Sequence, residues 1–280
     1  MKILAALGLG LGGYLLYRRA QRLPTLTVRT VDGLRNYAVY APTPAPLTLI
    51  VLLHGAGGST RTLAGRGWED VADRGNAMLA FPEGLIGPMG RRAWNHRVGY
   101  VHTPGATTDV DDVGYLAFLI GILRQQHPSI RRVILVGHSN GGAMAYRFAS
   151  ERGDMLGGLV VTNGTIGLTM TDGSGARTFY APQHPIPVVI FHGGRDNWRG
   201  GFSPVGEHHA TWQPVAAAVQ VYRTVNRADQ MAQVMNPGAV MLWHQRWTGT
   251  APVEVVVDRD RGHELPRWNW AGHAWRALNS

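Results

Sequence analysis

Short apolar runs alternate with longer amphipathic segments from residue 24 to the end of the chain. Six runs have the length of a strand, and most of them end at a glycine or proline: Leu49–Leu53, Met78–Phe81, Val133–Val136, Leu159–Thr162, Val188–Phe191 and Val253–Val257. Runs with little polar alternation are typical of strands buried on both faces, as in a parallel sheet covered by helices. Before them, Leu26–Thr30 and Asn36–Ala41 flank Asp32-Gly33, which favours a hairpin turn.

The segments between these runs predict helices. Asp111–Arg124 places apolar residues at i, i+3 and i+4 spacing, which gives a helix one buried face. Further helices are expected over Ala143–Arg152, Trp212–Asn226 and Trp270–Leu278. Because strands and helices alternate, we predict one α/β domain over residues 24–280, with a doubly wound, mostly parallel sheet and helices on both faces.

Residues 1–23 form a separate hydrophobic segment. Ile3–Tyr17 is uncharged and mostly apolar, with Lys2 before it and Arg18-Arg19 after it. As a helix it would be about 22 Å long, which is short of the ~30 Å hydrocarbon core of a membrane but suits a signal sequence. No small-residue cleavage site follows. We therefore expect an uncleaved signal anchor or membrane-associating helix of a cell-envelope or secreted protein, with its orientation open; the alternative is a disordered or packed N-terminal helix.

Composition narrows the chemistry further. The chain has no cysteine, which excludes disulfides, thiolate catalysis and cysteine-ligated zinc. Its net charge is +9, but the arginines are scattered and no basic run with interleaved aromatic residues occurs. We expect a generally basic surface and no nucleic-acid partner. No His-x-x-x-His pair is present, so neither a metal site nor another cofactor is predicted.

The clearest chemical motif follows the strand at Val133–Val136. It reads Gly137-His138-Ser139-Asn140-Gly141, and a predicted helix follows at once. This G-x-S-x-G pattern between strand and helix places a serine on a sharp, strained turn with its hydroxyl exposed above the sheet. The backbone N–H of Asn140 then faces a developing oxyanion. A plain tight turn is the alternative interpretation.

A second glycine-rich loop, His54–Ser59, follows the strand at Leu49–Leu53. Small residues let the backbone approach a substrate carbonyl, and Ala56 is the candidate for the second oxyanion donor. A phosphate-binding turn is the competing interpretation, but neither G-x-G-x-x-G nor Gly-Lys-Ser/Thr is present. Histidines beside these motifs are expected to be structural neighbours: His54, His138 and His192.

An acid and a base are expected after the serine, in that order along the chain. Asp196 follows the strand at Val188–Phe191, and His263 follows the last predicted strand. In this hypothesis His263 removes the serine proton, and Asp196 holds the imidazole and stabilises its charged form. The rivals are Asp258 and Asp260 for the acid and His273 for the base; Asp196 could also be a simple turn cap.

With these motifs in place, the chain resembles the α/β-hydrolase esterases of the polyhydroxybutyrate depolymerase and feruloyl/acetylxylan esterase group. The likeness runs from about Asn36 to His263 and rests on segments in a fixed order: Tyr37–Pro42, Leu52–Ser59, Trp94-Asn95, Asp109–Gly114, Gly137–Met144, Phe191–Asp196 and Gly262-His263. It implies the α/β-hydrolase fold, an exported serine esterase, and Ser139, Asp196 and His263 as the triad. The chain departs from the group after the acid, with Asn197–Gly201, and after the histidine, with Glu264–Pro266.

The predicted function is hydrolysis of a carboxylic ester through an acyl-enzyme, on short hydroxyalkanoate, feruloyl or acetyl esters. The same triad could serve acyl transfer or peptide cleavage, and a non-catalytic membrane-associated binding protein is a more distant alternative. Trp94, Trp198 and Trp268 are candidate walls of a substrate pocket, or else packing aromatics. The acidic cluster Asp109, Asp111 and Asp112 has no role derivable from the sequence beyond capping a helix. The oligomeric state stays open.

Overall fold

The computed structural model describes residues 23–87, 90–96, 110–170, 177–196, 210–232 and 242–280. Strand β1 (Leu26–Thr30) and β2 (Gly33–Tyr40) form the expected hairpin at one edge of a ten-stranded sheet. Its other strands are β3 (Thr48–Leu53), β4 (Ala77–Pro82), β7 (Arg132–His138), β8 (Gly158–Thr162), β11 (Val188–Gly193), β13 (Gln230–Ala232), β14 (Leu242–Thr248) and β15 (Val253–Asp258).

The strand order is β1-β2-β4-β3-β7-β8-β11-β15-β14-β13, and the central strands from β4 to β15 run parallel. The edge strands pair antiparallel at both sides. Short strands form two small sheets outside this one: β5 (Leu85–Ile86) with β6 (Arg92–Ala93), and β9 (Gly167–Met170) with β10 (Arg177–Phe179) and β12 (Ala210–Trp212). All parallel strands therefore end at the same edge of the main sheet, where loops can converge.

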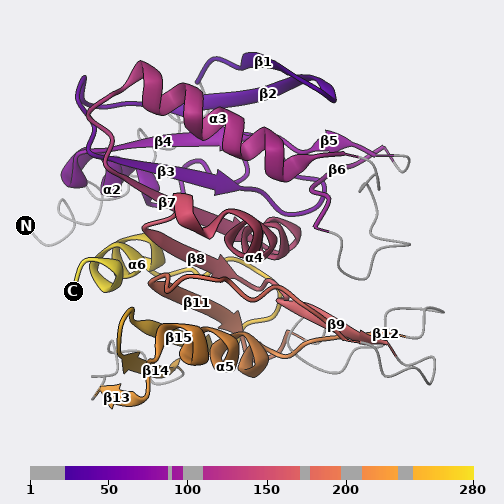
Figure 1. The fold of residues 1–280 in the computed structure, drawn as a ribbon, viewed down its shortest axis with the longest axis vertical. Coiled ribbons are helices and arrows are strands. Elements are labelled where there is room, and N and C mark those ends of the chain that lie inside the picture. The colour runs from indigo at the N-terminus through magenta and orange to yellow at the C-terminus, as the bar shows by residue number, and fades with distance from the viewer. Residues whose placement is uncertain (1–22, 88–89, 97–109, 171–176, 197–209, 233–241) are drawn as a thin grey trace, which may run out of the picture.

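Helices cover both faces of the main sheet, as the sequence predicts (Figure 1). One face packs against α3 (Asp112–Gln126), α4 (Asn140–Arg152) and α5 (Val215–Asn226). The opposite face packs against α2 (Trp68–Gly75) and α6 (Trp270–Leu278). Strand β3 shows why both faces need a cover, because its apolar side chains alternate between them. Leu49, Val51 and Leu53 pack into one core, and Ile50 and Leu52 pack into the other.

Some helices and strands were not predicted from the sequence. Helix α2 was not predicted from the sequence, because its eight residues include four acidic or basic side chains and only a narrow apolar stripe. Strand β14 was not predicted because polar side chains interrupt its apolar pattern. It lies near one edge of the sheet, between β15 and the short edge strand β13. Neither element contains the uninterrupted apolar run that identified the six buried strands.

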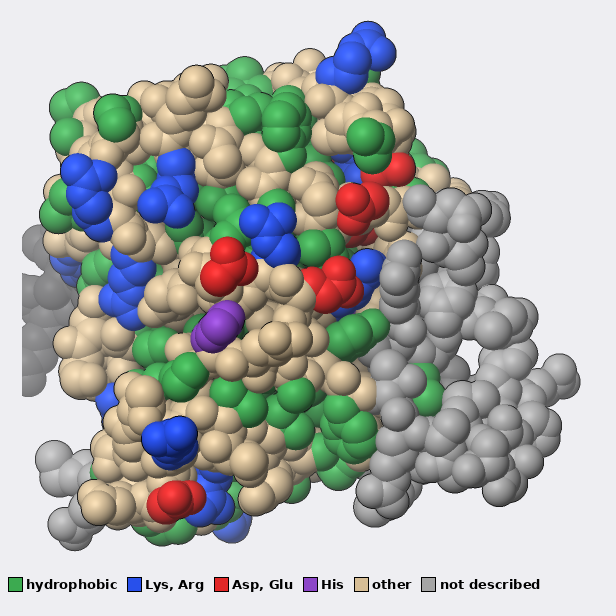
Figure 2. Space-filling view, viewed as in Figure 1, with side chains coloured by type: hydrophobic (Ala, Val, Ile, Leu, Met, Phe, Trp, Pro, Cys, Tyr) green, Lys and Arg blue, Asp and Glu red, His purple; other side chains and the backbone are tan. Residues whose placement is uncertain are grey.

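The N-terminal hydrophobic segment, residues 3–17, lies outside the described residues. Within the described part of the chain, no helix has both the length and the apolar character needed to cross a bilayer. On the face that carries α3, α4 and α5, arginines are dispersed among acidic and neutral side chains rather than gathered in one patch (Figure 2).

Candidate active site

The turn between β7 and α4 holds Ser139 in a backbone conformation that residues other than glycine rarely adopt. Its φ is 55° and its ψ is −118°, and its N–H donates to the Thr162 carbonyl at 2.9 Å. A Cβ on Gly137 would lie 2.2 Å from the Gly141 carbonyl oxygen, and one on Gly141 would lie 2.4 Å from the Leu53 oxygen. Both glycines are therefore required for this turn to close against β3.

Three side chains from distant parts of the sequence meet at this turn. The Oγ of Ser139 lies 2.7 Å from Nε2 of His263, and Nδ1 of His263 lies 2.7 Å from Oδ2 of Asp196. The Asp196 side chain is fully buried, whereas 31% of the His263 side chain is exposed. The structure thus joins a hydroxyl, an imidazole and a carboxylate in one line at the carboxyl edge of the sheet, which is the geometry of a nucleophile, its base and the group that orients the base.

The rival residues have other partners. Asp260 pairs with Arg195 at 2.8 Å on the surface. Asp258 lies 4.0 Å from Arg261. His273 contacts Glu254 from helix α6. Among the described contacts, none of these three groups reaches the serine.

Backbone contacts fix the two loops that carry Asp196 and His263. Gly194 N–H donates to the Asp258 oxygen and Arg195 N–H to the Arg261 oxygen, each at 2.7 Å. The loops approach so closely that a Cβ on Gly193 would lie 1.9 Å from the Gly262 oxygen. Backbone contacts alone therefore hold the loop of Asp196 next to the loop of His263.

Asn163 braces the same region and was not singled out from the sequence. It follows β8 with a φ of 50°, its Oδ1 accepts from Gly193 N–H at 2.9 Å, and its Nδ2 donates to the Glu264 oxygen at 2.9 Å. One side chain thus links β11 to the residue after His263. The signal that could have found it is Asn163-Gly164 directly after a buried strand, because asparagine tolerates positive φ.

The two candidate oxyanion donors belong to two segments that meet at the serine. Gly55 packs so closely that a Cβ there would lie 3.2 Å from the Ser139 Cβ. In the loop after β3, Gly57 N–H donates to the Arg92 oxygen and Gly58 N–H to the Gly55 oxygen. Among the described residues, the N–H groups of Ala56 and Asn140 have no protein acceptor. Backbone N–H groups on two segments beside a serine are of the kind that can donate to an oxyanion.

A buried tryptophan ties both donor-bearing segments together. Asn140 Oδ1 accepts from the Trp94 N–H at 2.7 Å, and Asn140 Nδ2 donates back to the Trp94 oxygen at 3.2 Å. The indole Nε1–H of Trp94 donates to the His54 oxygen at 2.9 Å. The ring is completely buried and stacks on Tyr115. Trp94 is therefore a packing residue rather than the open pocket wall that the sequence suggested.

Two histidines beside the serine are held neutral. Burial lowers the pKa of His54 to about 4, and its ring nitrogens contact the Gly55 oxygen at 2.7 Å and the Gly84 N–H at 3.0 Å. This fixes Nδ1 as the protonated nitrogen and the ring as a brace for the loop. Burial, and secondarily the neighbouring His263, lower the pKa of His138 to about 3. Neither ring competes with His263 as a base near neutral pH.

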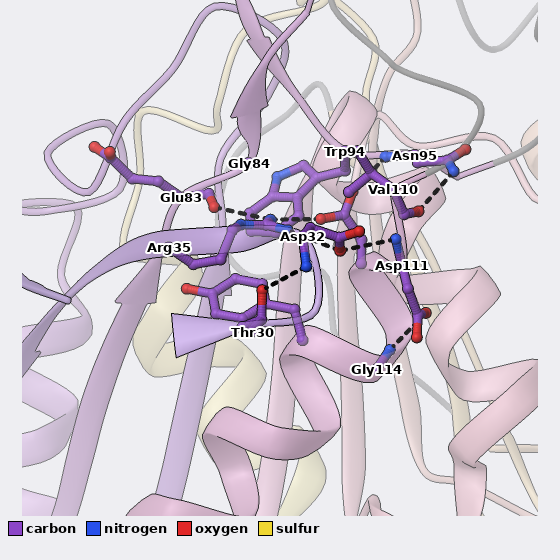
Figure 3. A network of polar contacts seen from close by, with 12 residues as sticks. Thr30, Asp32, Arg35, Glu83, Gly84, Trp94, Asn95, Val110, Asp111 and Gly114 are labelled. Atoms are coloured by element: carbon purple, nitrogen blue, oxygen red, sulfur yellow. Dashed lines mark hydrogen bonds and ion pairs between the residues drawn. The ribbon is translucent and has the colours of Figure 1, made fainter. Parts of the chain in front are cut away.

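The acidic cluster gains a structural explanation (Figure 3). Buried Asp112 accepts from Arg35 Nη2 at 2.5 Å and from the Asn95 N–H at 2.6 Å, through different oxygens. Burial raises its pKa, and Arg35 opposes that rise. Asp111 caps α3 through the Gly114 N–H at 2.9 Å. Asp109 lies outside the described residues. Asp112 therefore holds Asn95, the residue next to Trp94, against the core.

A polar cavity of about 880 Å³ opens beside His138. Trp268, the third candidate wall, lines it, together with side chains that include Arg66, Asp70 and Glu264. Trp198 lies outside the described residues. Of the two candidate tryptophans that the structure describes, Trp268 is the one that lines this cavity.

Several solved structures with a similar fold are described as esterases. A carboxylesterase from Mesorhizobium loti aligns with a TM-score of 0.57 at 14% identity, over 91% of this chain and 98% of its own. An acetyl xylan esterase from Aspergillus awamori aligns with a TM-score of 0.56 at 11% identity, over 91% and 99%. A Bacillus cereus carboxylesterase gives 0.53 at 15% identity, over 88% and 92%. No family model matches the sequence. These similarities show that the chain has the α/β-hydrolase fold.

Proposed function

We propose that this chain is a serine hydrolase that cleaves carboxylic esters through an acyl-enzyme. The observation that carries the proposal is the line from Ser139 Oγ through His263 to Asp196, with 2.7 Å at each step. The fold alone would not carry it, because one fold hosts many functions. The three groups, their order along the chain and their mutual distances together support nucleophilic catalysis by the serine.

The acylation step follows from this geometry. His263 Nε2 takes the proton of Ser139 as Oγ attacks the ester carbonyl, and the carbonyl oxygen becomes an oxyanion. The N–H groups of Ala56 and Asn140 donate to that oxyanion, and each such donor is typically worth about 3–4 kcal/mol in the transition state. His263 then gives its proton to the leaving alcohol, while Asp196 holds the Nδ1–H and stabilises the imidazolium. Water repeats the sequence and releases the acid.

The proposed substrates are short hydroxyalkanoate, feruloyl or acetyl esters. Their support is the ordered set of motifs shared with the depolymerase and feruloyl/acetylxylan esterase group, and the fold shared with an acetyl xylan esterase and two carboxylesterases. Trp268 at the cavity beside His138 is the proposed wall for the part of the substrate that lies next to the base. A panel of p-nitrophenyl esters, methyl ferulate and 3-hydroxybutyrate oligomers ranks these acyl groups by kcat/KM.

The test of the mechanism is pre-steady-state hydrolysis of p-nitrophenyl acetate. The wild-type chain is expected to release a burst of one p-nitrophenol per protein, and Ser139→Ala is expected to release none. Ser150→Ala, which changes another serine of α4, is the matched control and should keep the burst. A burst that survives Ser139→Ala refutes the proposed nucleophile.

We also propose that residues 3–17 attach the protein to a membrane, so that the hydrolase works in the cell envelope. The support is the uncharged apolar stretch between Lys2 and Arg18-Arg19. Membrane fractionation of the full chain beside a chain that begins at Pro24 tests this, and equal distribution of the two would remove the proposal.

A further inference from the structure

A second polar cluster lies at the junction of β14, β15 and α6. The Oε1 atom of Glu254 lies 2.9 Å from Nε2 of His244 and is also contacted by Nε2 of His273. All three candidate ligand atoms lie within 4.8 Å of one another. The side chains are 7%, 3% and 13% exposed for His244, Glu254 and His273, respectively. Three ligating atoms from three different elements thus converge at one nearly buried point.

Arg246 completes the surroundings of this cluster. Its Nη1 donates to the other carboxylate oxygen of Glu254, Oε2, at 2.7 Å, and the same guanidinium contacts the Ala277 oxygen in α6. Arg246 therefore fixes the carboxylate so that Oε1 faces both imidazoles. Outer partners of this kind are typical of ligating carboxylates, which are themselves hydrogen-bonded on the oxygen that does not bind the metal.

We propose that His244, Glu254 and His273 form a binding site for one divalent transition-metal ion of the Zn²⁺ class. Two imidazole nitrogens and one carboxylate oxygen are a preferred ligand set for such ions, and a fourth position is left for water. In a tetrahedral zinc site, ligand atoms lie about 3.3 Å apart, given metal–ligand distances of about 2.0–2.1 Å. Both imidazole nitrogens lie closer to Oε1 of Glu254 than this spacing, so each would move outward to make room for the ion.

The sequence predicted no metal site, and the placement explains why. The three ligands are separated by 10 and 19 residues and lie on two strands and a helix, so no short spacing motif marks them. Only the antiparallel pairing of β14 with β15, which sets His244 opposite Val256, and the packing of α6 against this sheet bring them together. Bound metal would fasten α6 to the edge of the main sheet.

The test is a Zn²⁺ titration of the full chain, produced without a polyhistidine tag, by isothermal calorimetry and thermal unfolding. The wild-type chain is expected to bind one Zn²⁺ at this site and to unfold at a higher temperature when Zn²⁺ is present, because the ion binds the folded state. His244→Gln and His273→Gln each keep an N–H donor toward Glu254 but remove a ligand. Each is expected to weaken binding at least tenfold and to abolish the thermal shift.

His184→Gln, which removes an exposed histidine elsewhere, is the matched control and should bind Zn²⁺ as the wild type does. Absence of saturable Zn²⁺ binding by the wild-type chain overturns the proposal. So does binding that both ligand variants retain in full, because the ion would then lie at other residues. Ester hydrolysis does not enter the readout, so the outcome is independent of the proposed enzymatic function.

Discussion

Replacing Asp112 by asparagine tests how the core supports the active site. The carboxylate accepts Arg35 Nη2 on Oδ1 and the Asn95 N–H on Oδ2. Asparagine has one oxygen, so its amide N–H₂ must face one of these two donors. The Arg35 side chain is completely buried and the Asp112 side chain is 1% exposed, so water cannot replace the lost acceptor.

The expected loss in the free energy of unfolding follows from removing one partner of a buried ion pair. Removing one partner typically costs about 3–5 kcal/mol, because the remaining charge stays buried without compensation. We expect Asp112→Asn to lower the free energy of unfolding by about that amount, and Arg35→Met to do the same from the other side. The double variant Arg35→Met/Asp112→Leu removes both charges of this pair, so its loss should fall short of the sum of the Arg35→Met and Asp112→Leu single losses by about 2 kcal/mol or more.

Urea unfolding followed by tryptophan fluorescence measures the wild type, the single variants Asp112→Asn, Asp112→Leu and Arg35→Met, and the double variant. Kinetics on p-nitrophenyl acetate separates stability from positioning, because the double variant still lacks an acceptor for the Asn95 N–H beside Trp94. We expect its kcat to stay about tenfold below wild type, with little change in KM. If the two losses simply add to within ~0.5 kcal/mol, the coupling through the ion pair is refuted.

Three further predictions concern separate parts of the molecule. Folded His54 has a pKa of about 4, below the ~6.5 of free imidazole, so only the unfolded chain takes up a proton between these values. The contribution of His54 to the free energy of unfolding should be fully present above about pH 6.5. Below that value the free energy of unfolding should fall by up to about 1.4 kcal/mol per pH unit because of this residue. In urea unfolding at pH 7 and pH 5, His54→Gln should lose less stability between the two pH values than the wild type loses. Asn140→Ala keeps the backbone donor but loses both side-chain contacts to Trp94, so kcat should fall about tenfold with KM little changed; unchanged kcat would remove the bracing role. Asp196→Asn should lower kcat by about 10⁴ through the wrong imidazole tautomer, and a loss under tenfold would count against the assigned acid.

The central sheet and the three groups of the candidate triad were within reach of sequence reasoning because each depends on a local pattern. The six apolar runs all correspond to strands, and each reacting residue follows one of these strands in a short loop. Parallel strands bring such loops to one edge. The order of serine, aspartate and histidine was therefore enough to predict which residues meet there.

The supporting contacts could not be predicted, because they depend on residues far apart in the sequence. Asp112 and Arg35 are 77 positions apart, and Asn163 and Glu264 are 101 apart. The sequence left Trp94 as either a pocket wall or a packing aromatic, because exposed and buried tryptophans have the same sequence signature. Only the packing of the segment at Trp94 between His54 and Asn140 shows that its ring belongs to the core.

Covalent acylation of Ser139 is the step on which the proposed mechanism depends, and mass spectrometry detects it. The chain is mixed with p-nitrophenyl acetate, quenched in acid within the first turnover and digested. We expect one acetyl group on the wild-type peptide that contains Ser139. The acetyl group should be absent in Ser139→Ala and present in Ser150→Ala. An acetyl group found on a different residue, or hydrolysis at the wild-type rate with Ser139 unmodified, would contradict it.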